Sequence, residues 1–183
     1  MTKYEEKYKI YSQKMIFGLI ALMEQMPFQA ITTTDVCRAA GVNRSTFYAH
    51  YHNTSDLLDE AEQWVLEDFS QYWNERVREL TFPYWNQRNL ECLLEYTKRN
   101  PGVVKAFFRE PSEAFVRKTM GWVVEHIVYP HTKASGDRIY AEYIARFYMS
   151  SVRAVILFWI ERGCRESTEE ICQIIMRCVD RRM

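Results

Sequence analysis

The sequence predicts an all-α protein of about nine helices, in which a three-helix, helix-turn-helix head (residues 1–54) precedes a larger helical domain (residues 55–183). Helix caps and helix breakers recur along the chain. Between them, apolar residues stand three or four positions apart, which is the periodicity of amphipathic helices. The clearest early run belongs to a first helix expected before Pro27, and it consists of Ile16, Leu19, Ile20 and Met23.

A helix-turn-helix pattern follows this first helix. Thr32 and Asp35 have the spacing of a capping box, in which a hydroxyl and a carboxylate each satisfy a backbone N–H group. The helix that they open is expected to end at Gly41, because glycine adopts the left-handed conformation of a helix C-terminus without strain. Asn43 then caps a second short helix, and Asn53 caps a third helix.

Five longer helices are expected after the two short ones, each bounded by a cap or a breaker. The first of the five is the helix capped by Asn53. The five helices cover residues 54–80, 86–99, 112–129, 137–162 and 168–180. Stretches that contain Pro or Gly separate most of them, and Ser167 with Glu170 repeats the capping-box spacing before the last. Residues 103–108 form a short segment after Asn100-Pro101-Gly102, and residues 131–136 form a polar loop.

The second short helix, residues 44–50, carries a distinctive set of polar groups. Its apolar side is formed by Phe47 and Tyr51. Its other side offers a guanidinium, short hydroxyls and ring donors, on Arg44, Ser45, Thr46, Tyr48 and His50. Such a helix suits the major groove of DNA, where side-chain donors meet base edges and phosphates. The same pattern also fits an ordinary amphipathic helix with a solvated polar face, so this pattern alone leaves both interpretations open.

Charge is distributed unevenly along the chain, although the net charge is zero. Through residue 55 there are six Lys or Arg against four Asp or Glu, whereas residues 56–70 hold six acidic residues and no Lys or Arg. A mildly basic head followed by an acidic segment fits a protein that offers one end to phosphate. Because the head is only weakly basic, we expect specific affinity to depend on dimerisation rather than on charge alone.

The sequence offers little support for an enzyme, a metalloprotein or a membrane protein. The five cysteines show no C-x-x-C spacing and are odd in number, which favours a reduced, cytoplasmic protein. His126 and His131 have no neighbouring carboxylate or thiol to complete a metal site, so no metal or cofactor is expected. Neither a P-loop nor a G-x-S-x-G motif is present. No apolar run approaches the ~20 residues of a membrane span, and the first residues lack a signal-peptide core.

Residues 28–58 resemble the N-terminal DNA-binding domain of the TetR family of transcriptional regulators. The matching elements are Phe28, Ile31 and Thr32, the turn Ala40-Gly41-Val42, the run Ser45 to Tyr48, and His50, Asn53, Leu57 and Leu58. The resemblance extends over about residues 7–60, a third of the chain. It implies that Lys7, Lys9 and Lys14 approach the DNA backbone. It implies a homodimer that places two recognition helices in successive major grooves about 34 Å apart on a pseudo-palindromic operator.

The resemblance also implies three sets of functional residues. Contacts with DNA are expected from Thr32, Thr33, Thr34, Asn43, Arg44, Ser45, Thr46, Tyr48, His50, Tyr51 and Thr54. A small apolar or aromatic effector is expected among Trp64, Trp73, Tyr96, Phe107, Phe108, Phe115, Trp122, Tyr143 and Phe147. Each of these rings taken singly also fits a plain aromatic core. Dimerisation through the last two helices is expected at Ile156, Trp159, Ile160, Ile171, Ile174, Ile175 and Cys178.

Two functional interpretations follow from this resemblance. The first is a ligand-responsive regulator, most simply a repressor, whose effector favours a conformation with the wrong spacing of the two heads. The second is a co-regulator that acts through a protein partner, with little intrinsic binding of DNA or small ligands. Thr34 and Thr54 favour the second, because family members often carry basic residues there.

A looser resemblance also favours the co-regulator. Residues 158–175 are similar to the regulators of dihydroxyacetone kinase, a subgroup with members that assist a partner at the promoter. A third interpretation, an all-helical enzyme, has no nucleophile–base pair or metal set in its favour.

Overall fold

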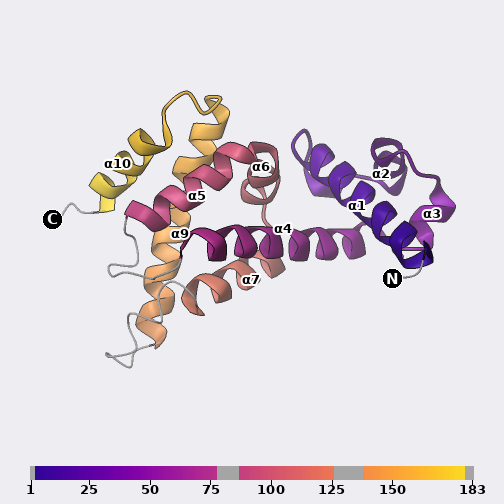
Figure 1. Cartoon of the computed structure of the whole chain (residues 1–183), viewed down its shortest axis with the longest axis horizontal. Helices are drawn as coiled ribbons and strands as arrows, with labels where there is room; N and C mark the ends of the chain where they lie inside the picture. The colour runs from indigo at the N-terminus through magenta and orange to yellow at the C-terminus, as the bar shows by residue number, and fades with distance from the viewer. Residues whose placement is uncertain (1–2, 78–86, 126–137, 180–183) are drawn as a thin grey trace. The chain divides into compact units, whose positions relative to one another are not determined.

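The computed structural model describes residues 3–77, 87–125 and 138–179, and Figure 1 labels its helices. All regular elements within these ranges are helical, which confirms the predicted all-α class. The described α-helices are α1 (Lys3–Met23), α2 (Thr33–Ala40), α3 (Arg44–Tyr48), α4 (Thr54–Arg76), α5 (Gln87–Arg99), α6 (Pro101–Arg109), α7 (Glu113–Val123), α9 (Arg138–Glu161) and α10 (Thr168–Val179). A short 3-10 helix, η1 (Phe28–Ala30), follows α1.

The chain divides into two compact units. Unit 1 comprises Met1–Glu67 with Gly102–Glu110, and unit 2 comprises Asp68–Pro101 with Pro111–Met183. Helix α4 begins in unit 1 and continues into unit 2, whereas α6 belongs to unit 1. The predicted boundary at residue 54 concerns functional domains and stays a prediction.

Unit 1 is built on one buried side of α1. Met15 and Leu19 of α1 are fully buried, as are Val36, Phe47 and Leu57 from the three following helices. Gly18 allows α1 to approach α2 closely, because a Cβ atom at this position would lie only 3.1 Å from the backbone nitrogen of Ala40. A small residue at position 18 is therefore needed where α1 packs against α2.

The caps of the short helices agree with the sequence-based predictions. Thr32 and Asp35 form the capping box, and Gly41 has φ = 65° in the left-handed region. Ser167 and Glu170 form the second capping box: Glu170 N donates to Ser167 Oγ, and Ser167 N donates to Glu170 Oε2. The predicted helix ends were less accurate, because α1 ends at Met23 and α3 ends at Tyr48.

The segment after Asn100 forms a helix, α6, where the sequence analysis expected only a short segment. Pro101 is its first residue. Proline is well suited to this position, because its fixed φ is already helical and the first N–H group of a helix has no intrahelical partner. Pro101 therefore both ends α5 and begins α6.

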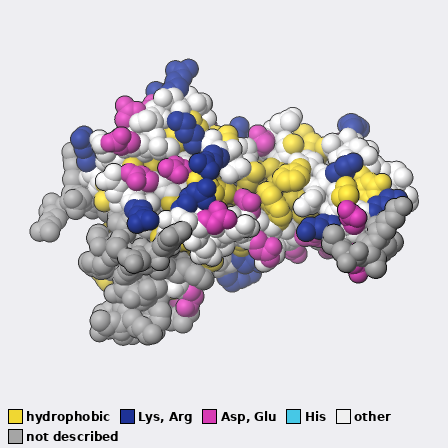
Figure 2. Space-filling view, viewed as in Figure 1, with side chains coloured by type: hydrophobic (Ala, Val, Ile, Leu, Met, Phe, Trp, Pro, Cys, Tyr) yellow, Lys and Arg dark blue, Asp and Glu magenta, His cyan; other side chains and the backbone are white. Residues whose placement is uncertain are grey.

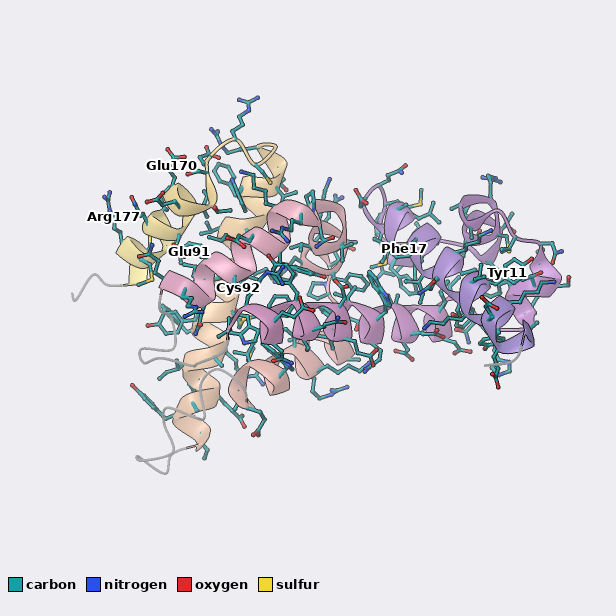
Figure 3. All side chains as sticks on the ribbon, in the orientation of Figure 1. Tyr11, Phe17, Glu91, Cys92, Glu170 and Arg177 are labelled. Atoms are coloured by element: carbon teal, nitrogen blue, oxygen red, sulfur yellow. The ribbon has the colours of Figure 1, made fainter. Side chains whose placement is uncertain are left out.

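Unit 2 has a core rich in aromatic residues. Trp73 of α4, Cys92 of α5 and Val123 of α7 are buried together with Ala141 and Ala145 of α9. Cys92 and Glu91 are labelled in Figure 3 on α5. The stretch that joins α9 to α10 is held by Trp159, which is almost fully buried and whose Nε1 donates to the Glu166 carbonyl at 3.1 Å.

Residues Ile139–Glu161 of α9 form the one described helix that is long and apolar enough to cross a membrane by length and composition. One side of α9 is packed into unit 2, through Ala141, Ala145, Val152, Ile156 and Trp159. This spacing of three, four or seven residues is that of a helix packed in a protein core.

Several sequence-based predictions fall outside the described residues. They concern the break at Phe82-Pro83-Tyr84, the ends of the predicted helices near Leu80 and Pro130, the loop over residues 131–136, and the two histidines His126 and His131.

Candidate nucleic-acid interface

The orientation of α3 is set by one side chain and one cap. Phe47 is fully buried and its ring lies 5.7 Å from that of Tyr51. Asn43 precedes the helix, and its Oδ1 accepts hydrogen bonds from Thr46 N and Ser45 Oγ, both at 2.7 Å. With Phe47 held inside and the first turn capped, Arg44, Ser45 and the half-exposed Tyr48 face solvent.

Arg44 and Tyr48 form a polar pair along the exposed side of α3. Arg44 Nη2 donates to Tyr48 Oη at 3.4 Å, and the guanidinium carbon lies 5.9 Å from the tyrosine ring centroid. The hydrogen bond with Arg44 is the largest cause that lowers the pKa of the Tyr48 hydroxyl, and a hydrogen bond with Thr33 is the second. The hydrogen bond between Arg44 and Tyr48 also raises the pKa of Arg44. The pair thus keeps a permanently charged guanidinium beside a hydroxyl, as contacts to base edges and phosphates require.

The three threonines that open α2 differ in their surroundings. The Thr32 hydroxyl accepts from Asp35 N and lies against the Asp35 carboxylate, which also accepts from Thr32 N. The hydrogen bond from the Thr32 side chain, ahead of that from its backbone, lowers the pKa of Asp35. The Thr32 hydroxyl is therefore engaged in the cap, whereas Thr33 is half-buried and Thr34 is exposed.

The two ring residues after α3 are held by α1. Tyr51 is only 4% exposed, and its Oη lies 2.7 Å from Ser12 Oγ. His50 is half-buried and stacks on Tyr8, with ring centroids 3.9 Å apart and an interplanar angle of 18°. Desolvation by burial raises the pKa of Tyr51 and lowers that of His50. Tyr51 is therefore held inside unit 1 by α1, and its contact with DNA stays a prediction.

Tyr8 and Ser12 were missed by the sequence analysis. Both are on α1, one turn apart, and they hold the two rings that follow the recognition helix. The available signal was the i, i+4 spacing of two hydrogen-bonding residues beside the lysines of α1. Only the lysines of this part of α1 were predicted to have a role.

The start of α4 and the lysines of α1 complete the polar surface of unit 1. Asn53 Oδ1 accepts from Ser55 N at 2.8 Å and from Asp56 N at 3.0 Å, which leaves Thr54 as the half-buried first residue of α4. Lys7 and Lys14 are exposed, and their ammonium groups lie 5.7 and 5.8 Å from the centroid of the Tyr11 ring. Tyr11 is labelled in Figure 3.

The rings expected around an effector are only partly brought together. Trp73, Tyr96 and Trp122 meet around Phe69 in unit 2, with centroid distances to its ring of 5.8, 5.1 and 5.5 Å. Tyr96 Oη donates to Asp68 Oδ2 at 2.8 Å, and burial raises the pKa of Tyr96. Phe69, which contacts all three rings, was not among the predicted residues.

The other expected effector residues lie elsewhere. Phe115 is buried in unit 2, whereas Tyr143 and Phe147 are 71% and 68% exposed on α9. Trp64, Phe107 and Phe108 belong to unit 1, so the nine rings do not line a single site within either unit. A groove of about 470 Å³ in unit 2 contains none of them, and is lined by Pro111, Glu113, Val116, Arg117, Met120, Gly121, Val124, Glu142 and Arg146.

The residues expected at a dimer contact also divide into two groups. Ile156, Trp159, Ile171 and Ile175 are buried within the chain, and Ile160 is half-buried. The four buried residues contribute to the core of the subunit, and the expected role of this set at a dimer contact stays a prediction. Ile174 and Cys178, on one side of α10, are exposed. The exposed apolar and small residues of α9 are different ones, namely Ile139, Tyr140, Tyr143, Phe147, Ser150, Ser151, Ala154 and Phe158.

Within the residues that the structure describes, no three His, Cys, Asp or Glu side chains are grouped so as to hold a metal ion.

The capped turn between α2 and α3 and the outward polar side of α3 define a helix-turn-helix, DNA-binding transcriptional regulator. Two family models match the chain. One, described as the C-terminal region of transcriptional regulators, matches residues 86–181, and the other, described as bacterial regulatory proteins of the tetR family, matches residues 19–61. The chain belongs to the TetR family of transcriptional regulators.

Solved structures share the fold along nearly the whole chain. A TetR transcriptional regulator from Streptococcus agalactiae 2603V is 21% identical with a TM-score of 0.67, covering 97% of this chain and 98% of that one. The fatty acid degradation regulator FadR from Bacillus halodurans is 13% identical with a TM-score of 0.71, covering 91% and 92%.

The dihydroxyacetone kinase operon activator DhaS is a weaker structural neighbour. It is 20% identical with a TM-score of 0.53, covering 92% of this chain and 93% of that one. At these identities the likenesses show the fold alone. A search of curated proteins found no significant match.

Proposed function

We propose that this protein is a homodimeric, ligand-responsive repressor that binds a pseudo-palindromic operator from the cytoplasm and has no catalytic role. The observation that carries the proposal is the exposed polar side of α3, where Arg44, Ser45 and Tyr48 face outward while Phe47 is fully buried. A five-residue helix with a buried anchor and a capped first turn is rigid enough to present its side chains in one register on DNA.

The exposed side of α9 supports the homodimer. Tyr140, Tyr143, Phe147 and Phe158 are all more than half exposed and follow one another at helical spacing, with small residues at Ser151 and Ala154. The Ser151 hydroxyl donates to the Phe147 carbonyl of its own helix at 3.0 Å, so it presents little free polarity to a partner. An apolar stripe with small residues at its centre suits a helix from a second copy, packed around a two-fold axis.

The aromatic cluster of unit 2 supports an apolar or aromatic effector. Phe69, Trp73 and Trp122 are mutually in contact, and the Tyr96–Asp68 hydrogen bond gives the cluster one polar group. Rings with a polar edge bind such molecules by stacking and one or two hydrogen bonds. An effector that favours one arrangement of the dimer would weaken operator binding by its difference in affinity for the two states.

A co-regulator acting through a protein partner is the second candidate. It is favoured by Thr34 and Thr54, which place hydroxyls at positions of α2 and α4 where a basic residue would add a phosphate contact. The same stretch of α4 is strongly acidic, with six Asp or Glu between residues 56 and 70.

Selection of bound duplexes from a random pool by the purified protein tests the proposal. A pseudo-palindrome with half-sites about one helical turn apart is the expected result. Enrichment of a single half-site would contradict the homodimer on DNA. If no sequence is enriched until a cell extract is added, the co-regulator is the correct function.

A further inference from the structure

A groove lies in unit 2 where residues of α7 and α9 come together, and both helices are labelled in Figure 1. Its volume is about 470 Å³, which falls within the roughly 300–1,000 Å³ of small-molecule sites. None of the residues predicted to bind an effector lines the groove, and neither does Phe69. The groove is therefore a separate site from the aromatic cluster of unit 2.

The floor of the groove is apolar. Val116, Met120 and Val124 line it at i, i+4 and i+8, along α7 and its C-terminal cap. Val116 is 38% exposed, Met120 is half-buried and Val124 is only 3% exposed, so this row of side chains passes from the rim to the interior. Such a row offers the hydrocarbon part of a ligand a surface on which it leaves water.

Gly121 keeps the groove open. It lies one turn after Arg117 on α7, and a Cβ atom at this position would have no neighbouring heavy atom within 4 Å. A larger side chain here would therefore extend into the groove without a clash with the core.

Two guanidinium groups line the groove, one from each helix. Arg117 of α7 and Arg146 of α9 are both exposed. Within the residues that the structure describes, neither side chain has an ion pair or a hydrogen bond to another residue. Figure 2 shows Lys and Arg interspersed with Asp and Glu on one face of the molecule. Two uncompensated guanidinium groups on one groove are thus a local feature.

The two carboxylates of the groove have other interactions that balance their charge. Glu113 is in the first turn of α7, where the backbone N–H groups of the helix N-terminus stabilise a negative charge. Glu142 has an interaction partner of its own. Arg117 and Arg146 lie inside their helices, away from the C-terminal turns that would stabilise a cation. The unmatched charge of the groove is therefore positive, which favours an anionic ligand over an ammonium ion.

We infer that this groove binds an organic monocarboxylate with an apolar body. The carboxylate accepts hydrogen bonds from the guanidinium groups of Arg117 and Arg146, whose planar forks match carboxylate geometry. The apolar body covers Val116, Met120 and Val124. Because Arg146 is not part of the exposed stripe of α9, the site needs neither DNA nor a second copy of the chain. The inference goes beyond the proposed function and does not depend on it.

Octanoate, octylamine and octan-1-ol test the inference, because they share an aliphatic chain and differ in the charge of the head group. Their binding to the full chain is measured by isothermal titration calorimetry at neutral pH. We expect octanoate to bind at least about tenfold more tightly than the other two, because only its head group accepts charge-assisted hydrogen bonds from arginine.

Two arginine variants test how the carboxylate is bound. Arg117→Gln and Arg146→Gln should each weaken octanoate binding by about tenfold, because each keeps a polar side chain but loses the charge. Arg177→Gln is the matched control, since Arg177 is exposed on α10, outside the groove, and is labelled in Figure 3. Circular dichroism and the unfolding temperature should stay unchanged in all three variants, because the side chains are exposed.

A third variant tests the place of binding. Gly121→Leu should abolish octanoate binding, because the new side chain occupies the groove. Ala21→Leu adds a side chain at an exposed position of α1 in unit 1 and should leave octanoate binding unchanged.

Four results would overturn the inference. They are an absence of octanoate binding, octan-1-ol binding as tight as that of octanoate, unchanged octanoate affinity in both arginine variants, and unchanged affinity in Gly121→Leu. Random-duplex selection with Arg117→Gln separates this inference from the proposed function. We expect it to return the same site as the wild type, and loss of that site would show that the groove serves DNA binding instead.

Discussion

At the scale of residues, the recognition surface depends on how hydrogen bonds are shared between neighbours. The Thr32 hydroxyl accepts a hydrogen bond in the cap of α2, while Arg44 donates a hydrogen bond to Tyr48 along α3. A DNA contact of Arg44, as proposed, would compete with the Arg44–Tyr48 hydrogen bond. Because that bond is long and exposed, it directs the guanidinium without holding it strongly.

Replacing Arg44 tests its role in base recognition. Arg44→Ala should cost roughly 1–3 kcal/mol of operator affinity and relax the preference at one base pair. Tyr48→Ala should weaken binding to all sequences alike, because we assign it a phosphate contact. The measurement is duplex selection followed by anisotropy titration. Wild-type preference in Arg44→Ala would show that this residue does not read a base.

The salt dependence of DNA binding tests the missing charge at the start of α4. Thr54→Lys adds a cation at the first residue of the helix, beside the Asn53 cap. The slope of log K against log salt should become steeper by about one, because one more phosphate is neutralised. The matched control is Ser70→Lys, at a half-buried polar position farther along α4 in unit 2. An equal change of slope in both variants would mean that Thr54 is not near phosphate.

At the scale of elements, α1 does more than close the head. Tyr8 stacks on His50 and Ser12 bonds to Tyr51, so α1 holds both rings that follow the recognition helix. The groups around His50 are Tyr8, Tyr11 and Ser12 on α1, Tyr51 beside it, and Glu60 of α4. Burial outweighs the carboxylate, which leaves the pKa of His50 below its usual value.

This lowered pKa gives the head a defined pH dependence. A histidine with a folded pKa below the unfolded value of 6.5 binds its proton more readily in the unfolded state. Its contribution to stability is therefore present above pH 6.5 and is lost as the pH falls through the folded pKa. The free energy of unfolding of the wild type should fall with pH in this range more steeply than that of His50→Asn. His52→Asn, at an exposed position, should behave like the wild type.

At the scale of the whole molecule, α9 serves two surfaces at once. Its buried residues, such as Ile156 and Trp159, close unit 2, while Phe147 and Phe158 are exposed. The apolar residues of α9 and α10 therefore divide between a core and an uncovered stripe. A copy of the same chain is the occupant that the proposed function requires.

Two substitutions separate these roles. Phe147→Glu should give a folded monomer in sedimentation at micromolar concentration, because it places a charge in the proposed dimer contact. Trp159→Ala should instead lower the free energy of unfolding of the subunit by about 3–5 kcal/mol, because it leaves a cavity in the core. Val116→Glu, on α7, is the surface control. Dimers in Phe147→Glu would place the contact elsewhere.

The sequence by itself determined the all-helical class, the caps and the turn between α2 and α3. These depend on interactions within a few residues, such as the hydrogen bonds of Thr32 with Asp35 and the left-handed backbone at Gly41. The outward polar residues of α3 also followed from local spacing, because a buried Phe47 dictates which neighbours face solvent.

Only the tertiary structure decided which apolar residues are buried and which are left uncovered. Helical periodicity places Ile156 and Phe158 on different sides of α9, but both sides are apolar, so the pattern cannot say which one packs inside the subunit. In the same way, only the position of α1 showed that Tyr51 contacts Ser12, and only the folded structure showed that Trp73, Tyr96 and Trp122 meet around Phe69. Contacts between residues far apart in sequence arise from packing, which local spacing does not encode.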